Sequence, residues 1–461
     1  MINIFNSKLF VLFVFPFILG AITILSFEPF NLTIINFFTF PLLLFLILIV
    51  KKKTYLKYKK KISNRYFFYL GCAYGFGFFL IGNYWISISL THDEMFKSLI
   101  PFALIIIPLF LSIFLGLAIL SVGFFCEKNI SFILFFSLVF SIFEFLRGHL
   151  LTGFPWNLIA YTWSWSKETT QILSLIGTYS LSLISITFFC LPFLFFNKNS
   201  LNKKIILCMI FTIIFISNYY YGKYKISNSA YNYDKNFSIK IISPNFSLKD
   251  YTSKSEISQL ERLIKVSNPD INKKTLFIWP EGVFYESYLR DIKKYKNLFS
   301  SKFSKNHLII LGVNSYSDSK KSEDKKYFNS LVLLNNELKI LSSYNKINLV
   351  PFGEFLPFEK LLSKFGFKKI TQGYSSFSAG NKRMMINLGS EFNEKRILPL
   401  ICYEIIYPGN IKNDKQHPDL IVNISEDAWF GKSIGPYQHF SKAIYRAIEE
   451  GIFVARSANK G

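Results

Sequence analysis

The pattern of apolar and polar positions changes halfway along the 461-residue chain. Up to about residue 220 the sequence is mostly long runs of Phe, Leu and Ile, whereas beyond about residue 235 short apolar runs alternate with polar residues. A helix that crosses a bilayer needs roughly 20 apolar residues. Seven segments of the first half fit that length: about 8–26, 31–50, 66–90, 98–126, 130–147, 172–196 and 204–221. The pattern predicts a multi-pass α-helical membrane domain in residues 1–225.

The second half has the shorter periods of an ordinary globular domain. Two segments, 256–266 and 437–451, have helical spacing, and the second ends at Gly451. Short β-branched or aromatic runs predict strands between them: 237–243, 275–279, 307–313, 329–334, 397–403, 419–425 and 452–457. Strands that alternate with helices predict an α/β layered domain in residues 235–461.

Composition and charge add a membrane setting and an orientation. The chain is 51% hydrophobic and 18% aromatic, which is too apolar for one soluble globule. Lys-rich loops follow the second and sixth apolar segments, whereas the loops SFEPFN and THDEMFK on the other side are poor in Lys and Arg. The positive-inside rule then puts the N-terminus inside, and seven crossings leave the polar half exported.

The net charge of +24 raises the question of nucleic acid. No stripe of Lys and Arg interleaves with stacking aromatic residues, and much of the excess charge lies in loops beside apolar runs. We therefore expect an anionic membrane surface, and no nucleic acid, as the partner of this charge.

Three polar residues lie directly after apolar strand-like runs or beside them: Glu281 in FIWPEG, Lys346 in YNKINLVPFGEF and Cys402 in ICYE. Sheets of α/β domains usually build their sites there. A cysteine thiol is only a few per cent ionised near pH 7. A carboxylate can take its proton, and an ammonium group can stabilise both the thiolate and a tetrahedral oxyanion. Glu, Lys and Cys together supply these roles without a histidine.

Each of these residues also has a structural interpretation. Cys402 is the only cysteine of the polar half and could be a small buried hydrophobic residue, Glu281 could cap a helix, and Lys346 could face solvent. An unpaired cysteine in an oxidising compartment is nevertheless a liability unless its thiol is needed. Spacing alone does not identify the reaction.

The histidines offer an alternative, a Cys/His dyad with His417 or His439. His439 lies in a helical pattern, so we expect it to pack or cap, and His307 begins a strand, so we expect a structural role. No His/Cys spacing suits a zinc site, and we expect no metal or other cofactor.

The stretch EFLRGHLLTGFPWNLIAYTWSW, between the fifth and sixth apolar segments, is dense in polar and aromatic residues. Taken singly, its residues are typical of an interfacial aromatic belt with an Arg147 that reaches toward water. As a cluster they also suit a lipid headgroup site: Glu144, Arg147, Pro155, Trp156 and Asn157.

Several of these stretches resemble the motifs of one family. WPEG, YNKINLVPFGEFLPF, ICYEIIYPG, NISEDAWFGKSIGPYQHF and RAIEEGIFVARSANKG are similar to successive motifs of bacterial apolipoprotein N-acyltransferases. EFLRGHLLTGFPWN and GFGFFLIGNYWI resemble the membrane motifs of that family, which soluble nitrilases lack. The resemblance covers nearly the whole chain. It implies a membrane bundle joined to an exported nitrilase-like (carbon–nitrogen hydrolase) αββα sandwich.

The resemblance also implies roles residue by residue. Glu281 matches the catalytic base, Lys346 the lysine that stabilises the oxyanion, and Cys402 the nucleophile. Three supporting positions match as well: Glu354, which would hold Lys346 and take part in proton transfer, and Tyr403 and Glu404, which follow the nucleophile.

The chain departs from the family in two places. The segment 242–253 lacks a Trp that the family usually carries near the active site, and Tyr251 is the expected aromatic substitute. The chain stops at Gly461, where the family continues, so the resemblance predicts that the last strands and a last membrane helix are missing.

The candidate substrate- or lipid-binding residues are Tyr251, Trp156, Asn157, Arg147 and Trp429.

The implied reaction is the last step of lipoprotein maturation at the bacterial inner membrane, with the catalytic domain on the periplasmic side. An acyl chain would move from a phospholipid, expected to be phosphatidylethanolamine, through a Cys402 thioester to the α-amine of the diacylglyceryl-cysteine of an apolipoprotein. Two alternatives stay open. One is a membrane-tethered amidase or nitrilase acting on a small soluble substrate, and the other is a silent scaffold in which Cys402 only packs.

Overall fold

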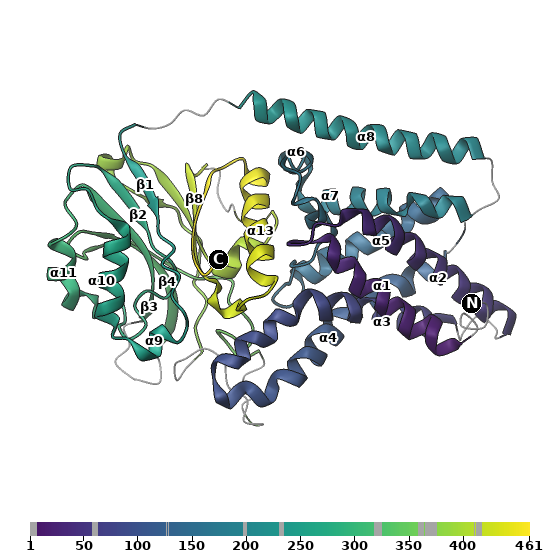
Figure 1. Ribbon diagram of the computed structural model, residues 1–461, viewed down its shortest axis with the longest axis horizontal. Helices are drawn as coiled ribbons and strands as arrows, with labels where there is room; N and C mark the ends of the chain where they lie inside the picture. Colours follow the sequence, from purple (N-terminus) through teal and green to yellow (C-terminus); the bar gives the residue numbers. More distant parts are fainter. Residues whose placement is uncertain are drawn as a thin grey trace. The chain divides into compact units, whose positions relative to one another are not determined.

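The chain folds into two compact units, Met1–Ser229 and Ala230–Gly461, which are described separately here (Figure 1). The structure is a computed structural model. It describes residues 7–57, 63–125, 127, 129–196, 201–229, 235–317, 325–357, 364, 376–409, 411 and 417–461.

The N-terminal unit is helical, and each of the seven apolar segments contains a helix. The helices are α1 (Phe15–Thr23), α2 (Asn36–Lys57), α3 (Ser63–Asn83), α4 (Ile100–Gly123), α5 (Ile130–His149), α7 (Leu173–Cys190) and α8 (Leu201–Ser227), with a short α6 (Lys167–Thr170) before α7. Within the described residues, five helical stretches are long and apolar enough to cross a membrane: Thr33–Lys53, Glu94–Gly123, Ile130–His149, Leu173–Phe196 and Leu201–Ser227. The predicted helical bundle is confirmed, and the number of seven crossings stays a prediction.

Two glycines allow α1 and α3 to pack backbone against backbone. A Cβ atom on Gly20 would lie 2.0 Å from the carbonyl oxygen of Tyr74, and one on Gly77 would lie 2.1 Å from that of Phe17. No larger side chain fits at either position. Small residues at helix contacts are typical of membrane bundles, where close packing has to replace the hydrophobic effect between helices.

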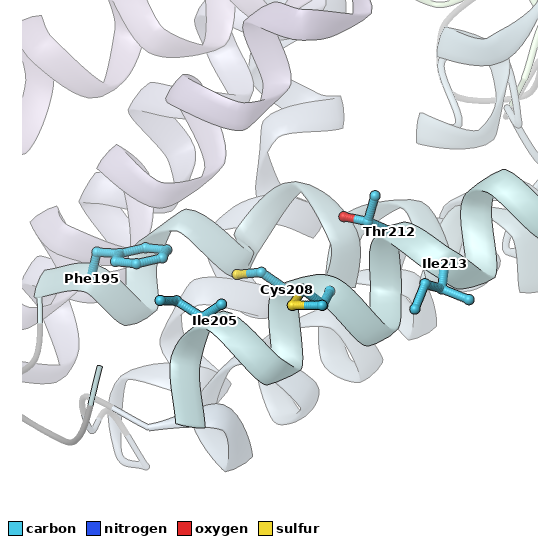
Figure 2. Close-up of a pocket in the computed structure, with 6 residues that line it drawn as sticks. Phe195, Ile205, Cys208, Thr212 and Ile213 are labelled. Carbon is cyan, nitrogen blue, oxygen red and sulfur yellow. The ribbon is translucent and has the colours of Figure 1, made fainter. Parts of the chain in front are cut away.

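Helix α8 leaves most of its apolar side chains exposed. An open apolar groove runs between α8 and the 3₁₀ helix η8 (Leu191–Phe196). Figure 2 shows side chains that line it: Phe195, Ile205, Cys208, Thr212 and Ile213. None of the residues predicted to do chemistry lies in this groove. Its exposed apolar lining suits contact with hydrocarbon better than contact with water.

The C-terminal unit contains two sheets. The first has the order β1-β2-β3-β4-β5, made of β1 (Ser238–Ile241), β2 (Thr275–Ile278), β3 (His307–Tyr316), β4 (Tyr327–Asn335) and β5 (Ile340–Asn345). The second has the order β6-β7-β8-β9, made of β6 (Ile386–Asn387), β7 (Arg396–Ile401), β8 (Leu420–Glu426) and β9 (Val454–Asn459). Strands β1, β2 and β3 are parallel, as are β7, β8 and β9, whereas β4, β5 and β6 pair antiparallel to their neighbours.

Alternating side chains divide the C-terminal unit into layers. In β2, Leu276 and Ile278 point into the core between the two sheets, where they join side chains such as Val422 of β8. Phe277 points the other way, into a second core that includes Leu260 of α10 (Glu256–Ser267). Because side chains of a strand alternate between faces, the period of two in the sequence gives both cores at once.

Helices cover the outer faces of both sheets, so the layers follow the order αββα (Figure 1). Helix α10 and the short α9 (Asp250–Ser253) and α11 (Lys296–Ser300) belong to the first sheet, and α13 (Gly435–Glu450) covers the second. The predicted αββα sandwich is confirmed. Both predicted helices are present, and α13 ends where Gly451 adopts a positive φ.

The sequence-based strand bounds were wrong at one place that matters. The run 397–403 was predicted as one strand, but β7 ends at Ile401 and a 3₁₀ turn, η13 (Cys402–Ile406), begins at the cysteine. Strands β5 and β6 were not predicted.

Candidate active site

The backbone at Cys402 turns sharply just after the end of β7. Its φ of +49° lies in the left-handed region, which costs a residue with a side chain about 1–3 kcal/mol. The carbonyl oxygen of Cys402 accepts a hydrogen bond from Asn423 Nδ2 at 3.4 Å, and His439 Nε2 lies 3.3 Å from the same oxygen. These contacts hold the turn, so the half-buried thiol lies beyond the strand end.

Glu281 lies just after β2, on the turn formed by Trp279, Pro280 and Gly282. Its Oε1 accepts a hydrogen bond from Asn329 Nδ2 at 2.7 Å, and its Oε2 accepts one from the backbone N–H of Glu426 at 3.0 Å. The carboxylate also acts on the Cys402 thiol, and each group shifts the pKa of the other. Glu281 is therefore placed to receive the thiol proton.

Lys346 follows β5 and is 1% exposed. Its Nζ lies 2.9 Å from both carboxylate oxygens of Glu354 and 3.8 Å from Oε1 of Glu281. Glu354 also accepts hydrogen bonds from the backbone N–H of Val350 and from Asn329 Nδ2, both at 2.8 Å. The structure thus brings Glu281, Lys346 and Glu354 into one buried cluster, beside Cys402.

The electrostatics of the cluster define its resting state. Burial by itself would lower the pKa of Lys346, but the carboxylates of Glu354 and Glu281 raise it above the ordinary value, so Nζ stays charged. Burial raises the pKa of the Cys402 thiol, Glu281 raises it further, and Lys346 opposes the rise. Burial also raises the pKa of Glu281, with Lys346 again opposing. The sulfur therefore rests as a thiol, and a thiolate forms only when a base takes its proton.

Glu404 ties the turn that carries the cysteine to the loop that carries the lysine. It is fully buried. Five donors surround its carboxylate: the Tyr344 hydroxyl (2.7 Å), the backbone N–H groups of Ile347 (2.9 Å), Asn348 (3.2 Å) and Ile401 (2.8 Å), and Arg383 Nη2 (3.1 Å). Tyr403, the other supporting residue, is buried with its ring edge-on to Tyr407.

Two residues of this framework were missed from the sequence. Asn329 donates to both Glu281 and Glu354, and Arg383 pairs with Glu404. Asn329 begins a predicted strand, and Arg383 lies in a polar segment without periodicity. Neither carries a local signal that separates it from an ordinary surface residue.

The histidine dyad finds no support in the described hydrogen bond of the sulfur, whose partner is Ser425. His439 faces the Cys402 carbonyl oxygen and pairs with Asp427 at 3.0 Å. His307 contacts the carbonyl oxygen of Asp270 at 2.9 Å, in line with the expected structural role, and His417 is exposed. Among the described residues, no group of three or more His, Cys, Asp or Glu is arranged to hold a metal ion.

The candidate lipid-binding residues lie in different places. Arg147, Trp156 and Asn157 are buried inside the N-terminal unit. The guanidinium of Arg147 donates to the carbonyl oxygens of Phe154 and Asn157 instead of reaching outward. Trp429 is half-buried in the 3₁₀ helix η14 (Asp427–Phe430) of the C-terminal unit. The side chain of Tyr251 is outside the described part of the chain.

Glu144 also belongs to the headgroup cluster and lies on α5. It is as buried as Arg147. It accepts hydrogen bonds from the backbone N–H of Ile159 at 2.9 Å and from the hydroxyl of Ser182. Together with Arg147 it fixes the loop that follows α5 from the inside.

Comparison with known proteins agrees with this architecture. Residues 19–191 match the apolipoprotein N-acyltransferase N-terminal domain, and residues 290–461 match the carbon–nitrogen hydrolase family. The second match includes Lys346 and Cys402 and begins after Glu281.

Several relatives match over most of the chain, and two of them illustrate the similarity. An apolipoprotein N-acyltransferase from Bradyrhizobium diazoefficiens is 31% identical, over 96% of this chain and 82% of its own length. One from Rickettsia typhi is 34% identical, over 85% of this chain and 77% of its own length.

A solved structure of Saccharomyces cerevisiae Nit3, a member of branch 10 of the nitrilase superfamily, aligns at 15% identity over 50% of this chain and 79% of its own, with a TM-score of 0.31. The assignment rests on the sequence relatives and on the two family matches, which agree with the resemblance found in the motifs. The chain belongs to the apolipoprotein N-acyltransferase family.

Proposed function

We propose that this chain moves an acyl chain from a phospholipid to the α-amine of the N-terminal diacylglyceryl-cysteine of apolipoproteins, with Cys402 as the nucleophile. The observation that carries the assignment of residues is the cluster around the thiol. Glu281 and the thiol shift each other's pKa, and Lys346 Nζ lies 3.8 Å from Oε1 of the same carboxylate. A base and a fixed cation beside one thiol are what a thioester mechanism requires.

The first half-reaction forms the acyl-enzyme. Sγ of Cys402 attacks the ester carbonyl carbon while Glu281 takes the S–H proton, and the charged Lys346 stabilises the oxyanion. When the tetrahedral intermediate collapses, the ester C–O bond breaks and the leaving oxygen takes the proton from Glu281. A lysophospholipid leaves, and the acyl group stays on the sulfur.

The second half-reaction returns the enzyme to its start. The amine of the lipoprotein attacks the thioester and gives one proton to Glu281, the C–S bond breaks, and the proton returns to the sulfur. Glu354 keeps Lys346 charged and in place through both steps. Two substrates that visit one thiol in turn give ping-pong kinetics.

The family and the apolar helices support a membrane setting. We propose residues 1–225 as a membrane domain of about seven helices in the inner membrane, and residues 235–461 as a catalytic domain on the periplasmic side. Phosphatidylethanolamine is the proposed acyl donor. In this proposal Trp429 and Tyr251 contact lipid directly, while the buried Arg147, Trp156 and Asn157 shape the membrane domain that presents it.

The test is the intact mass of the purified full chain after incubation with phosphatidylethanolamine vesicles. The expected result is a gain of one acyl group that is absent from Cys402→Ala and is lost on addition of a diacylglyceryl lipopeptide. Hydrolysis of small amides without an acyl-enzyme from phospholipid would favour the amidase, and a protein without either reaction would favour the scaffold.

A further inference from the structure

The hydroxyl of Ser425 contacts the proposed nucleophile from the neighbouring strand. In the parallel pair of β7 and β8, Ile401 lies opposite Ile424, so Ser425 is one residue farther along and level with the cysteine. Its Oγ lies 3.3 Å from Sγ of Cys402 and 2.6 Å from Oδ1 of Asp427. The serine therefore stands between the sulfur and a buried carboxylate.

Asp427 is ionised in the folded protein. Arg456 Nη2 lies 2.6 Å from its Oδ2, and His439 Nδ1 lies 3.0 Å from its Oδ1. Burial opposes ionisation of Asp427, but Arg456 and His439 outweigh burial and hold the pKa of this carboxyl well below its usual range. An ionised carboxylate can only accept hydrogen bonds.

A serine hydroxyl has one hydrogen, and here two groups compete for it. At 2.6 Å from a carboxylate oxygen, Ser425 has to donate to Asp427, so a lone pair of Oγ faces the sulfur in the resting state. This arrangement suits a thiol, which can donate its S–H proton to Oγ. It does not suit a thiolate, which can only accept.

We propose that Ser425 is a further catalytic residue, whose hydroxyl hydrogen turns from Asp427 to the sulfur while the S–H proton moves to Glu281, and turns back once the sulfur is acylated. Ser425 neither gains nor loses a proton in this step. Asp427 then sets how strongly the resting state favours the thiol. The inference rests on the proposed function, because it assumes that Cys402 has to become a thiolate.

Two substitutions near the sulfur should change the ease of thiolate formation in opposite directions. Glu281, Lys346 and Asp427 all act on the thiol, and His439 reaches its backbone carbonyl. Ser425→Ala removes a donor that the thiolate needs, so thiolate formation becomes harder. Asp427→Asn weakens the competitor and removes a negative charge, so thiolate formation becomes easier.

The experiment measures how fast iodoacetamide alkylates Cys402 across a range of pH in the purified full chain, with the site resolved by peptide mass. A hydrogen bond to a charged group is strong enough that Ser425→Ala should slow alkylation roughly tenfold below the midpoint of the profile and move that midpoint to higher pH. Asp427→Asn should speed alkylation by a similar factor. Cys208 of the N-terminal unit, alkylated in the same sample, is the internal reference.

Ser457→Ala is the matched control, because Ser457 is a buried serine of the next strand whose hydroxyl donates to the Ile242 carbonyl oxygen at 2.6 Å. Its profile should overlay that of the unmodified chain. The proposal is overturned if Ser425→Ala also overlays it, or if Asp427→Asn speeds alkylation equally with and without Ser425. If Asp427→Asn does not fold, the pair Ser425→Ala and Ser457→Ala decides.

Alkylation needs no acyl transfer, so the two proposals fail in different ways. Retained N-acylation in Cys402→Ala would overturn the proposed function, whatever the alkylation profile. An unchanged profile in Ser425→Ala would overturn the role of the serine while leaving the thioester mechanism in place.

Discussion

Cys402 combines an unfavourable backbone conformation with a favourable position. A φ of +49° costs a residue with a side chain about 1–3 kcal/mol, which the surrounding contacts have to offset. Had β7 continued through the cysteine, Sγ would have followed the alternation of the strand into one of its faces. The turn instead presents the sulfur at the strand end, next to Glu281 and Ser425.

At this residue we expect Cys402→Ala to abolish both half-reactions and to leave the fold intact, because the change removes little volume. Cys402→Ser should accept an acyl group but turn over slowly, since an oxygen ester is a worse acyl donor than a thioester. The measurements are acyl-enzyme mass, N-acylation of a lipopeptide and thermal unfolding. N-acylation by the alanine variant would contradict the mechanism.

Glu281 and Lys346 should act as one unit. Glu281→Gln keeps the shape but cannot take the thiol proton, so single-turnover acylation should fall by roughly 10²–10⁴-fold. Lys346→Met removes the charge that faces the oxyanion, a loss of about 10²–10³-fold. The acylation rate of the double variant should be only slightly below that of the slower single variant. Strictly additive losses would mean that the two residues serve different steps.

The pH dependence of acylation should report Glu281. Burial raises its pKa above the ordinary value of 4.5. The carboxylate is the form that accepts a proton, so the rate should fall as the pH drops through this raised pKa, and the acid limb should lie above pH 4.5. The Glu281→Gln variant, measured over the same range, should lack this limb. A limb at or below the ordinary value would argue against Glu281 as the base.

At the scale of elements, the candidate site residues follow three strands, β2, β5 and β7. The sequence predicted β2 and β7 but not β5. Glu281 follows β2 and Cys402 follows β7, both of which are buried apolar runs that stand out in the pattern. Lys346 follows β5, an edge strand whose first residues, Ile340 and Leu341, are exposed. An edge strand with little burial shows only a weak alternation of apolar and polar residues, so β5 was not predicted.

The contacts between elements could not be predicted from local patterns. Arg383 meets Glu404, and Asn329 meets Glu281, across tens of residues of sequence, and each partner lies in a different local context. The resemblance to a family implied that Glu404 and Glu354 are supporting positions. Only the fold shows that Glu404 binds the loops on both sides of the site.

Glu404→Gln tests this link between elements. The amide places an NH₂ group among five donors, so at least one buried donor loses its acceptor and Arg383 loses its charge partner. Breaking a buried pair in this way costs about 3–5 kcal/mol, and the melting temperature should drop accordingly. Acylation should fall as well, because the lysine loop and the cysteine turn are no longer held together.

Glu391→Gln is the control for that prediction. Glu391 pairs with Lys274 at 3.0 Å, but its side chain is 75% exposed. A pair of this kind contributes about 0–1 kcal/mol, so the variant should melt close to the unmodified chain. Equal melting temperatures for both glutamine variants would mean that the buried contacts of Glu404 do not hold the site.

At the scale of the whole molecule, the two units bury their apolar side chains differently. In the C-terminal unit the two cores hold most of the large apolar side chains, whereas α4 and α8 of the N-terminal unit leave residues such as Phe102 and Ile213 largely exposed. Such faces would promote aggregation in water, but they fit a hydrocarbon environment. The long apolar runs therefore predicted this unit well, because membrane helices have to be apolar on the side that faces lipid.

The predicted orientation in the membrane rests on loop charge. The fold of neither unit reveals that orientation. Cys126, a natural reporter for an inside loop, lies outside the described residues, so placed cysteines are the better probes. In a chain without its native cysteines, three exposed positions report three regions: Lys53→Cys after the second apolar segment, Met95→Cys before α4, and Lys339→Cys in the C-terminal unit.

The charge pattern predicts that a membrane-impermeant maleimide labels Met95→Cys and Lys339→Cys in intact spheroplasts, and labels Lys53→Cys only after permeabilisation. An odd number of crossings is what separates Lys339 from Lys53, so this result would also limit the count between these two positions to odd values. Labelling of Lys53→Cys alone would reverse the orientation. Labelling of Lys53→Cys together with Lys339→Cys would mean that an even number of helices crosses the membrane between these two positions. The catalytic domain would then stay on the proposed side, and the predicted orientation of the first helices would be wrong.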